Sequence, residues 1–221
     1  IKEVPSNLYK DALRAAWAEI NITNLDFNIK QIKEKVGSGV KITGVVKADA
    51  YGHGSVRVAT VLRANGIESF AVATLSEAVR LRKSGFVLEE IMVLSPVPEP
   101  YIGTIIEHRL APVVCDYKNA EAISKAAAEA GILIKGYIAV DTGMGRIGYS
   151  DDTTSVEDVK MIAGLSNFKI NGLFSHFATA DAADKTYATV QEQRYMGFYK
   201  QLIKEGIDIP LRTLGNSAAV M

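Results

Sequence analysis

Reactive or polar side chains follow four apolar runs in this 221-residue sequence. They are Lys47, Arg146, His176 and the adjacent pair Asn216 and Ser217. The apolar runs have the length and the β-branched content of buried parallel strands. Because ligands bind at the carboxyl ends of strands in parallel folds, we expect these side chains to converge on one edge of a sheet.

Lys47 is the most informative of these residues because it directly follows a candidate strand. An ammonium group is costly to bury in such a position. Desolvation makes a lysine amine a better nucleophile, which is what Schiff-base chemistry requires. The local sequence by itself favours a lysine that reaches solvent and has no role, so Lys47 alone does not decide the function.

Several residues could contribute to an anion site. Tyr51 could donate a hydrogen bond to a phosphate or could simply pack. Gly52 and Gly54 permit a tight turn with exposed N–H groups. Asn216 and Ser217 could bind phosphate oxygens or cap a helix, and both roles are compatible because a helix N-terminus itself attracts anions.

Arg146 lies among glycines, so its guanidinium could meet a carboxylate or a phenolate with fork geometry. The alternative is a salt bridge to Asp141 or to another neighbouring residue. His176 could orient a catalytic group or share a proton with it, or could be a satisfied histidine at the edge of the sheet. We expect His53 to be an edge or helix-capping residue and His108 to have no role, and we expect no metal site.

Short apolar runs alternate with longer segments of helical period, which predicts a parallel α/β sheet. Periodicity leaves two architectures open, a doubly wound sheet and a (β/α)8 barrel, and the chain is shorter than the roughly 250 residues typical of such barrels. We expect seven strands, one fewer than a closed barrel needs: Ile42–Val46, Phe70–Ala73, Ile91–Leu94, Pro112–Cys115, Ile134–Val140, Ile170–Phe174 and Leu211–Leu214.

Sequence signals for the start of a helix lie before the first expected strand and between later ones. Between the sixth and seventh strands we also expect a long helix from about Tyr187 to Gly206. The expected N-caps are Thr23 or Asn24 before the first strand, Thr74 in a capping box with Glu77, Asp116 before an alanine-rich helix, and Ser155.

The overall composition argues against two classes of partner. Lys plus Arg and Asp plus Glu number 25 each, so the zero net charge provides no field to gather nucleic acid or anionic membrane. No apolar run is long enough to span a bilayer, and residues 1–5 do not resemble a signal peptide. With 48% hydrophobic residues and a single cysteine, Cys115, we expect a globular cytoplasmic protein without an internal disulfide.

Taken together, the segments after the strands resemble bacterial alanine racemases, which have a fold-type III pyridoxal-phosphate barrel. Residues 45–54, VVKADAYGHG, resemble the family's cofactor-lysine signature. Residues 141–148, DTGMGRIG, residues 175–181, SHFATAD, and residues 216–219, NSAA, resemble three further blocks. Residues 17–20, WAEI, are similar to the family's N-terminal strand. The blocks follow in the family's order along nearly the whole chain.

The resemblance implies a (β/α)8 barrel of TIM type, of which about seven of eight strands are present, and a bound pyridoxal 5'-phosphate. Lys47 would hold the cofactor covalently and act as one of two catalytic bases. Arg146 would face the phenolic oxygen of the cofactor and the substrate carboxylate, and His176 would lie beside the ring and help to orient the second base. The remaining cofactor contacts would come from Tyr51 and Ser217 at the phosphate, with Asn216 beside it, and from Val45 and Leu94 at the ring.

The chain departs from the family pattern in three respects. It stops at Met221, before the family's eighth strand with its pyridine-facing arginine and phosphate loop. It also stops before the C-terminal β-domain, which supplies a second base, a tyrosine, to the partner subunit of a homodimer. Ala139 stands where some members carry a lysine, modified by carbon dioxide, that supports the loop arginine, so Arg146 must find other support.

We therefore expect residues 1–221 to be an inactive or weakly active part of an enzyme, with Trp17–Ile20 belonging to the β-domain. The open sheet edges should associate with another chain, or the N-terminal segment should be repositioned.

The resemblance implies racemisation of a small amino acid, most simply L-alanine and D-alanine for cell-wall precursors in a bacterial cytoplasm, with serine as the alternative substrate. Two other functions are compatible with the fold type. A non-catalytic pyridoxal-phosphate carrier is also a lone barrel, but its lysine motif differs and its barrel is complete. Amino acid decarboxylases share the fold type, but residues 141–148 favour racemases. A gene that continues into an arginine-containing strand and a β-domain would favour the racemase.

Overall fold

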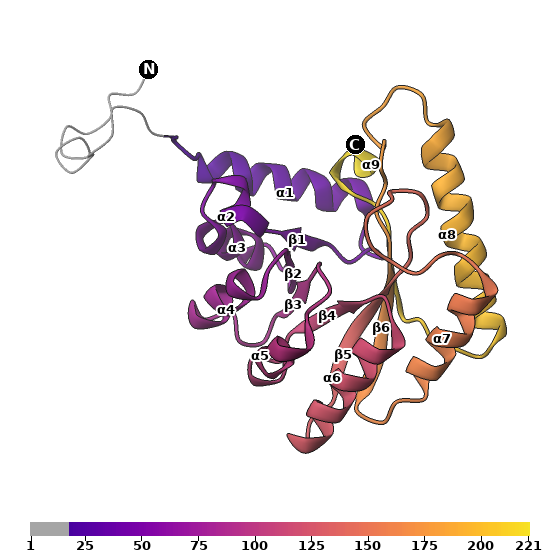
Figure 1. Cartoon of the computed structure of the whole chain (residues 1–221). Helices are drawn as coiled ribbons and strands as arrows, with labels where there is room; N and C mark the ends of the chain where they lie inside the picture. Colours follow the sequence, from indigo (N-terminus) through magenta and orange to yellow (C-terminus); the bar gives the residue numbers. More distant parts are fainter. Residues whose placement is uncertain (1–17) are drawn as a thin grey trace, which may run out of the picture.

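The computed structural model describes residues 18–221 (Figure 1). Strands β1 to β7 are Thr43–Val45, Ser69–Val72, Glu90–Val93, Ala111–Val114, Ile134–Ala139, Phe168–Phe174 and Leu211–Thr213. Helices α1 to α9 are Ile22–Val36, Lys47–Tyr51, Ser55–Ala64, Leu75–Lys83, Ile102–His108, Tyr117–Glu129, Thr153–Ala163, Thr186–Lys204 and Ser217–Val220, and a 3-10 turn, η2, spans Glu99–Tyr101.

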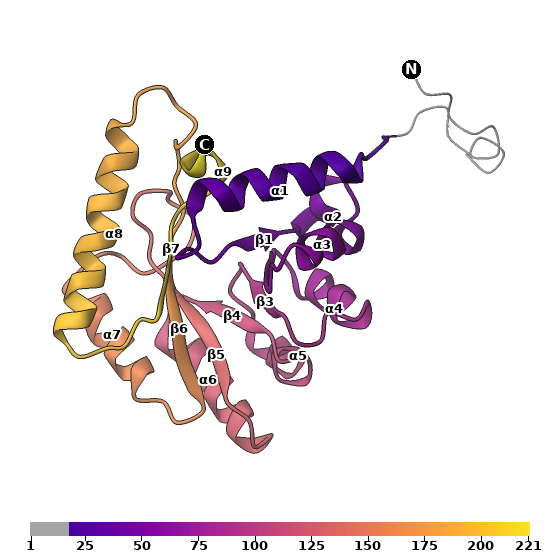
Figure 2. The ribbon, with the colours of Figure 1, turned by 180° about the vertical axis from the view of Figure 1, so that it is seen from behind.

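The seven strands form one sheet in which each strand pairs in parallel with the next strand along the chain. Doubly wound sheets reverse their strand order at a switch point, whereas this order never reverses. The sheet curls into a half-barrel with the helices α3 to α8 on its outer side (Figures 1 and 2). All seven expected strands are confirmed, and the strand order identifies the architecture as an incomplete (β/α)8 barrel. Within residues 18–221, no strand pairs with the outer edge of β1 or of β7.

Two of the expected helix caps are confirmed. The hydroxyl of Thr74 accepts a hydrogen bond from the N–H of Glu77, and the Glu77 side chain returns to the N–H of Thr74, which completes the capping box. Asp116 caps α6 by accepting from the N–H of Asn119 at 2.7 Å. Both caps satisfy N–H groups that the first turn of a helix leaves without a partner.

Two other expected caps are wrong. Asp152, not Ser155, caps α7, because the Asp152 carboxylate accepts from the N–H of Ser155 at 2.9 Å. Helix α1 begins before the expected Thr23 or Asn24, because the side chain of Asn21 caps it and accepts from the N–H of Asn24 at 3.0 Å. In each case a carboxylate or amide oxygen lies three residues before the N–H that it meets.

The sheet is covered by two apolar layers. The larger layer joins the sheet to the outer helices, and the smaller one lines the inside of the half-barrel. A cluster of three polar side chains lies across this inner face: Tyr137 donates a hydrogen bond to Glu90 at 2.7 Å, and Asn171 donates to the same carboxylate at 2.6 Å. These bonds tie β3 to β5 and β6 across the curl. The buried members of the inner layer are Ala71, Met92, Ala111, Val113, Tyr137 and Ala139.

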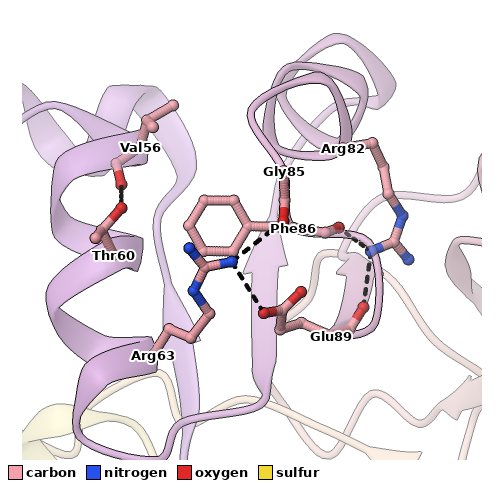
Figure 3. Close-up of polar contacts among 7 residues, drawn as sticks. All are labelled: Val56, Thr60, Arg63, Arg82, Gly85, Phe86 and Glu89. Atoms are coloured by element: carbon pink, nitrogen blue, oxygen red, sulfur yellow. Dashed lines mark hydrogen bonds and ion pairs between the residues drawn. The ribbon is translucent and has the colours of Figure 1, made fainter.

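Two arginines hold the connection from α4 to β3, at the end of the strands opposite to Lys47 (Figure 3). Arg82 donates to the carbonyl oxygens of Phe86 and Glu89 at 2.6 and 2.7 Å. The guanidinium carbon of Arg63 lies 4.4 Å from the centroid of the Phe86 ring, a cation–π distance. This end of the half-barrel therefore contributes to stability, while the other end carries the reactive side chains.

The expected strand Trp17–Ile20 is not found in the described part of the chain. Residues 18–20 belong to no helix or strand, and Trp17 lies outside the described residues. No helix within residues 18–221 is long and apolar enough to cross a membrane.

Candidate active site

The reactive side chains lie at the carboxyl ends of four strands. Lys47 is the first residue of α2, two residues after the end of β1, and Ser217 is the first residue of α9, after β7. Arg146 and His176 lie in the loops that follow β5 and β6. Both ribbon views show those two loops and α9 at the same end of the sheet (Figures 1 and 2). This is the edge at which parallel barrels bind their ligands.

The segment after Lys47 is a turn of left-handed helix. The backbone φ angles of Ala48, Asp49 and Ala50 are 51°, 52° and 54°, and that of Tyr51 is 54°. Each non-glycine residue in this conformation costs about 1–2 kcal/mol, so neighbouring structure must hold the turn. The sequence predicted a tight turn from its glycines but not a left-handed one.

Helices α3 and α4 hold this turn. The Asp49 carboxylate accepts from the N–H and the hydroxyl of Ser55 at 2.8 and 2.9 Å and lies 3.1 Å from the Arg80 guanidinium. The two hydrogen bonds from Ser55, and then the charge of Arg80, hold the pKa of Asp49 below its ordinary value. Glu77 accepts from the N–H of Ala48 at 2.6 Å. The residue after Lys47 is thus tied directly to α4.

The loop that carries Arg146 is organised by the carboxylate of Asp141. This carboxylate accepts from the N–H groups of Gly143, Gly145 and Arg146 at 2.9, 3.0 and 3.0 Å. Burial raises the pKa of Asp141, but these backbone hydrogen bonds outweigh it and leave the pKa below its ordinary value. The alternative in which the Arg146 guanidinium pairs with Asp141 is wrong, because Asp141 binds the backbone of Arg146 instead. Within residues 18–221, no ion pair or hydrogen bond holds that guanidinium.

His176 lies with Lys47 and Arg146. Burial lowers the pKa of the His176 imidazole, and the positive charges of Arg146 and Lys47 lower it further. The neutral form of the ring is therefore favoured, because both cations oppose its protonation. A small pocket between the loops is lined by Asp141, Met144, Arg146, Phe174, Ser175 and His176.

Helix α8 joins the two loops, a feature that the sequence did not reveal. The side chain of Gln191 is fully buried; it accepts from the N–H of Ala178 at 2.9 Å and donates to the carbonyl oxygen of His176 at 3.1 Å. Four residues earlier, the Tyr187 hydroxyl donates to the carbonyl oxygen of Gly143 at 2.6 Å. One face of α8 thus fixes the loop of Arg146 against the loop of His176. The polar side chains at this helical spacing were the only available signal.

The candidate phosphate-binding residues lie at the surface. The side chain of Tyr51 is 62% exposed, and Ser217 is exposed at the start of α9. Asn216 caps α9 by accepting from the N–H of Ala219 at 3.1 Å, which confirms its capping role. His53 also behaves as the capping residue that we expected, since its Nδ1 lies 3.0 Å from a carbonyl oxygen of the left-handed turn. No hydrogen bond within the described residues joins Tyr51 or Ser217 to Lys47.

The two apolar residues expected at the ring differ in exposure. Leu94 is half-buried and packs against the inner apolar layer just after β3. Val45, the last residue of β1, is 43% exposed at the edge of the sheet. Both are therefore free to contact a ligand placed over the carboxyl end of the half-barrel.

The arrangement combines groups that suit an anionic carbonyl compound. It has a primary amine at Lys47, a guanidinium at Arg146, a neutral imidazole at His176 and hydroxyl donors at Tyr51 and Ser217. Among residues 18–221, the side-chain polar atoms of these five residues have no hydrogen-bond or ion-pair partner. Such unpaired cations and donors suit carboxylate and phosphate groups, and an amine near them can condense with an aldehyde.

Comparison with known proteins agrees with this geometry. The family model described as "Alanine racemase, N-terminal domain" matches residues 20–221. The chain belongs to this family. It is 47% identical over 208 residues to the alanine racemase of Clostridium kluyveri, a match that covers 94% of this chain and 53% of that protein. It is 46% identical over 209 residues to alanine racemase 1 of Clostridium acetobutylicum, covering 95% of this chain and 54% of that protein.

Solved structures of this family have the same fold. The alanine racemase of Clostridium difficile 630 superimposes with a TM-score of 0.90 at 35% identity, over 93% of this chain and 53% of that one. The alanine racemase of Bacillus anthracis with bound L-Ala-P gives a TM-score of 0.86 at 32% identity, over 94% of this chain and 53% of that one. The chain thus spans about half the length of the alanine racemases that it matches.

Proposed function

We propose that the protein carrying this chain is an alanine racemase and that residues 18–221 supply most of its pyridoxal phosphate site. The observation that carries the proposal is the position of Lys47, Arg146 and His176 at the carboxyl ends of three strands of one sheet, with Arg146 and His176 lining the same pocket. The donor set fits the cofactor: an amine for its aldehyde, a guanidinium for its phenolic oxygen, and Tyr51 and Ser217 for its phosphate. Val45 and Leu94 would contact the ring.

The residues of this chain have separate tasks in the proposed reaction. Bound pyridoxal phosphate would stabilise the negative charge that develops at the substrate α-carbon. Lys47 holds the cofactor and moves the α-proton on one face. Arg146 binds the substrate carboxylate through charge-assisted hydrogen bonds. His176 is neutral at pH 7, so it adds no third positive charge and can orient a neighbouring base.

Racemisation needs proton removal on one face and delivery on the other, and one amine cannot readily serve both faces. We therefore include a second base on a partner subunit, as in the homodimer that the resemblance to alanine racemases implies. L-alanine and D-alanine are the proposed substrates, and supply of D-alanine to cell-wall precursors in the bacterial cytoplasm is the proposed role.

The direct test is interconversion of L-alanine and D-alanine by the full-length protein with added pyridoxal phosphate. Lys47→Ala should abolish it, whereas Lys169→Ala, at the opposite end of the strands, should leave it unchanged. Parallel assays with serine test the alternative substrate. Cofactor binding without turnover of any amino acid would favour the carrier function, and an active Lys47→Ala variant would contradict the proposal.

A further inference from the structure

We propose that Glu77 is a positioning residue for Lys47, an inference that rests on the proposed function. Glu77 lies in the first turn of α4, 30 residues after Lys47 in the sequence. Its carboxylate nevertheless accepts a hydrogen bond from the N–H of Ala48, the residue that follows Lys47, at 2.6 Å. The backbone of the reactive lysine is thus held by a side chain from the next strand–helix unit.

One carboxylate joins two segments of the barrel edge. Its Oε1 atom meets the N–H of Ala48, while its Oε2 atom accepts from the N–H groups of Ala73 and Thr74 at 2.8 and 3.0 Å. The Oε2 bond to Thr74 belongs to the capping box of α4, and the Oε2 bond to Ala73 is equally local to the start of that helix. The Oε1 contact has no role in capping α4, because it reaches Ala48 in α2.

The chemistry of the site requires a carboxylate at Glu77. All three partners are N–H donors, and an ionised carboxylate accepts at both oxygens. A glutamine amide would keep one accepting oxygen and turn its NH2 group toward the other N–H groups. We expect the amide oxygen of the glutamine to stay with the N–H groups of Ala73 and Thr74, because both lie close to residue 77 in the sequence. The N–H of Ala48 would then lose its acceptor.

The turn that Glu77 holds has an intrinsically unfavourable backbone conformation. Ala48, Asp49 and Ala50 all have left-handed backbone angles, which L-residues avoid. A second contact from α4, the ion pair of Arg80 with Asp49 at 3.1 Å, is exposed on both sides and therefore weak. The two hydrogen bonds from Ser55 hold the turn only at Asp49. Loss of the Glu77 contact would therefore let the end of the turn next to Lys47 relax toward right-handed angles and shift the Lys47 amine. A shift of about 1 Å can cost 100-fold in rate at a reacting centre.

The test compares Glu77→Gln with Thr74→Ala in the full-length protein. Thr74→Ala removes the hydroxyl that caps α4 but leaves the Glu77 carboxylate, so it controls for weakening of the helix end. Two quantities are measured: hydrogen–deuterium exchange of the peptide that contains residues 47–52, and the rate at which borohydride fixes added pyridoxal phosphate on Lys47. We expect Glu77→Gln to speed exchange at Ala48 and to slow capture, each by roughly tenfold or more, with Thr74→Ala near wild type in both.

Equal behaviour of the two variants, or no effect of Glu77→Gln on either quantity, would overturn the inference. If Glu77→Gln folds poorly, Glu77→Asp provides the same test, because its shorter side chain can keep the charge at the helix end without reaching Ala48. If wild type captures no cofactor at Lys47, the proposed function fails. The exchange measurement still decides whether Glu77 anchors the turn.

Discussion

Replacement of Ala48 by glycine should stabilise the protein, which is the reverse of the usual effect of glycine in a helical segment. Ala48 has φ 51° and ψ 47°, and its side chain is exposed. Glycine would remove the left-handed penalty of about 1–2 kcal/mol. It would also lose about 0.4–1 kcal/mol through the greater freedom of the unfolded chain. We expect a net stabilisation of about 0.5–1 kcal/mol, since the Ala48 side chain makes no buried packing contact.

Ala128→Gly is the matched control. Ala128 is exposed in the right-handed helix α6, so glycine there should destabilise the protein by about 0.5–1 kcal/mol. Urea denaturation of the full-length protein and of both variants measures the two changes, provided that the denaturant slopes agree. If Ala48→Gly destabilises as much as Ala128→Gly, the turn after Lys47 is not left-handed and the account of its strain is wrong.

Three further predictions concern the loops of the site. Arg146→Ala should lower turnover by orders of magnitude while changing stability by less than about 1 kcal/mol, the scale of surface substitutions; full activity or an unfolded variant would contradict this. The NMR titration midpoint of His176 should lie below its ordinary 6.5 and should rise in Arg146→Gln. Because the pKa of His176 is lowered in the folded protein, its contribution to stability is complete above pH 6.5 and declines as the pH falls toward the folded pKa. His176→Gln should remove this decline, and a variant with the same pH profile of urea denaturation as the wild type would contradict the prediction. Gln191→Leu leaves buried partners unsatisfied, so it should cost about 2–3 kcal/mol and reduce turnover. A urea midpoint equal to that of the wild type would exclude a joining role for α8.

The strands could be predicted from the sequence because the signal for each is local. Seven apolar β-branched runs, bounded by turn residues, gave all seven strands to within two residues at either end. The order of the strands within the sheet cannot be read from any single segment. The choice between a barrel and a doubly wound sheet therefore needed either the family motifs or the structure. The caps were less certain, because Asp152 and Ser155 are both good capping residues in one short segment, and only the geometry of α7 shows that the helix begins after Asp152.

Part of the site could also be predicted, because the position of a residue directly after a strand is a local signal. Lys47, Arg146 and His176 follow strands, and that rule alone brings them to one edge. The left-handed turn could not be predicted, because Ala48 has no local preference for it and the contact from Glu77 comes from another strand–helix unit. The role of Gln191 was missed because its partners lie on the loops after β5 and β6 rather than on its own helix.

If Lys47 is the amine of a pyridoxal phosphate site at this edge of the half-barrel, reduction should fix the cofactor on this residue. The most direct measurement is to incubate the full-length protein with the cofactor, reduce it with borohydride and map the labelled peptide by mass spectrometry. We expect one labelled peptide with the cofactor on Lys47, and no comparable label in Lys47→Ala. A protein that binds the cofactor well but carries it on a different lysine would contradict the account.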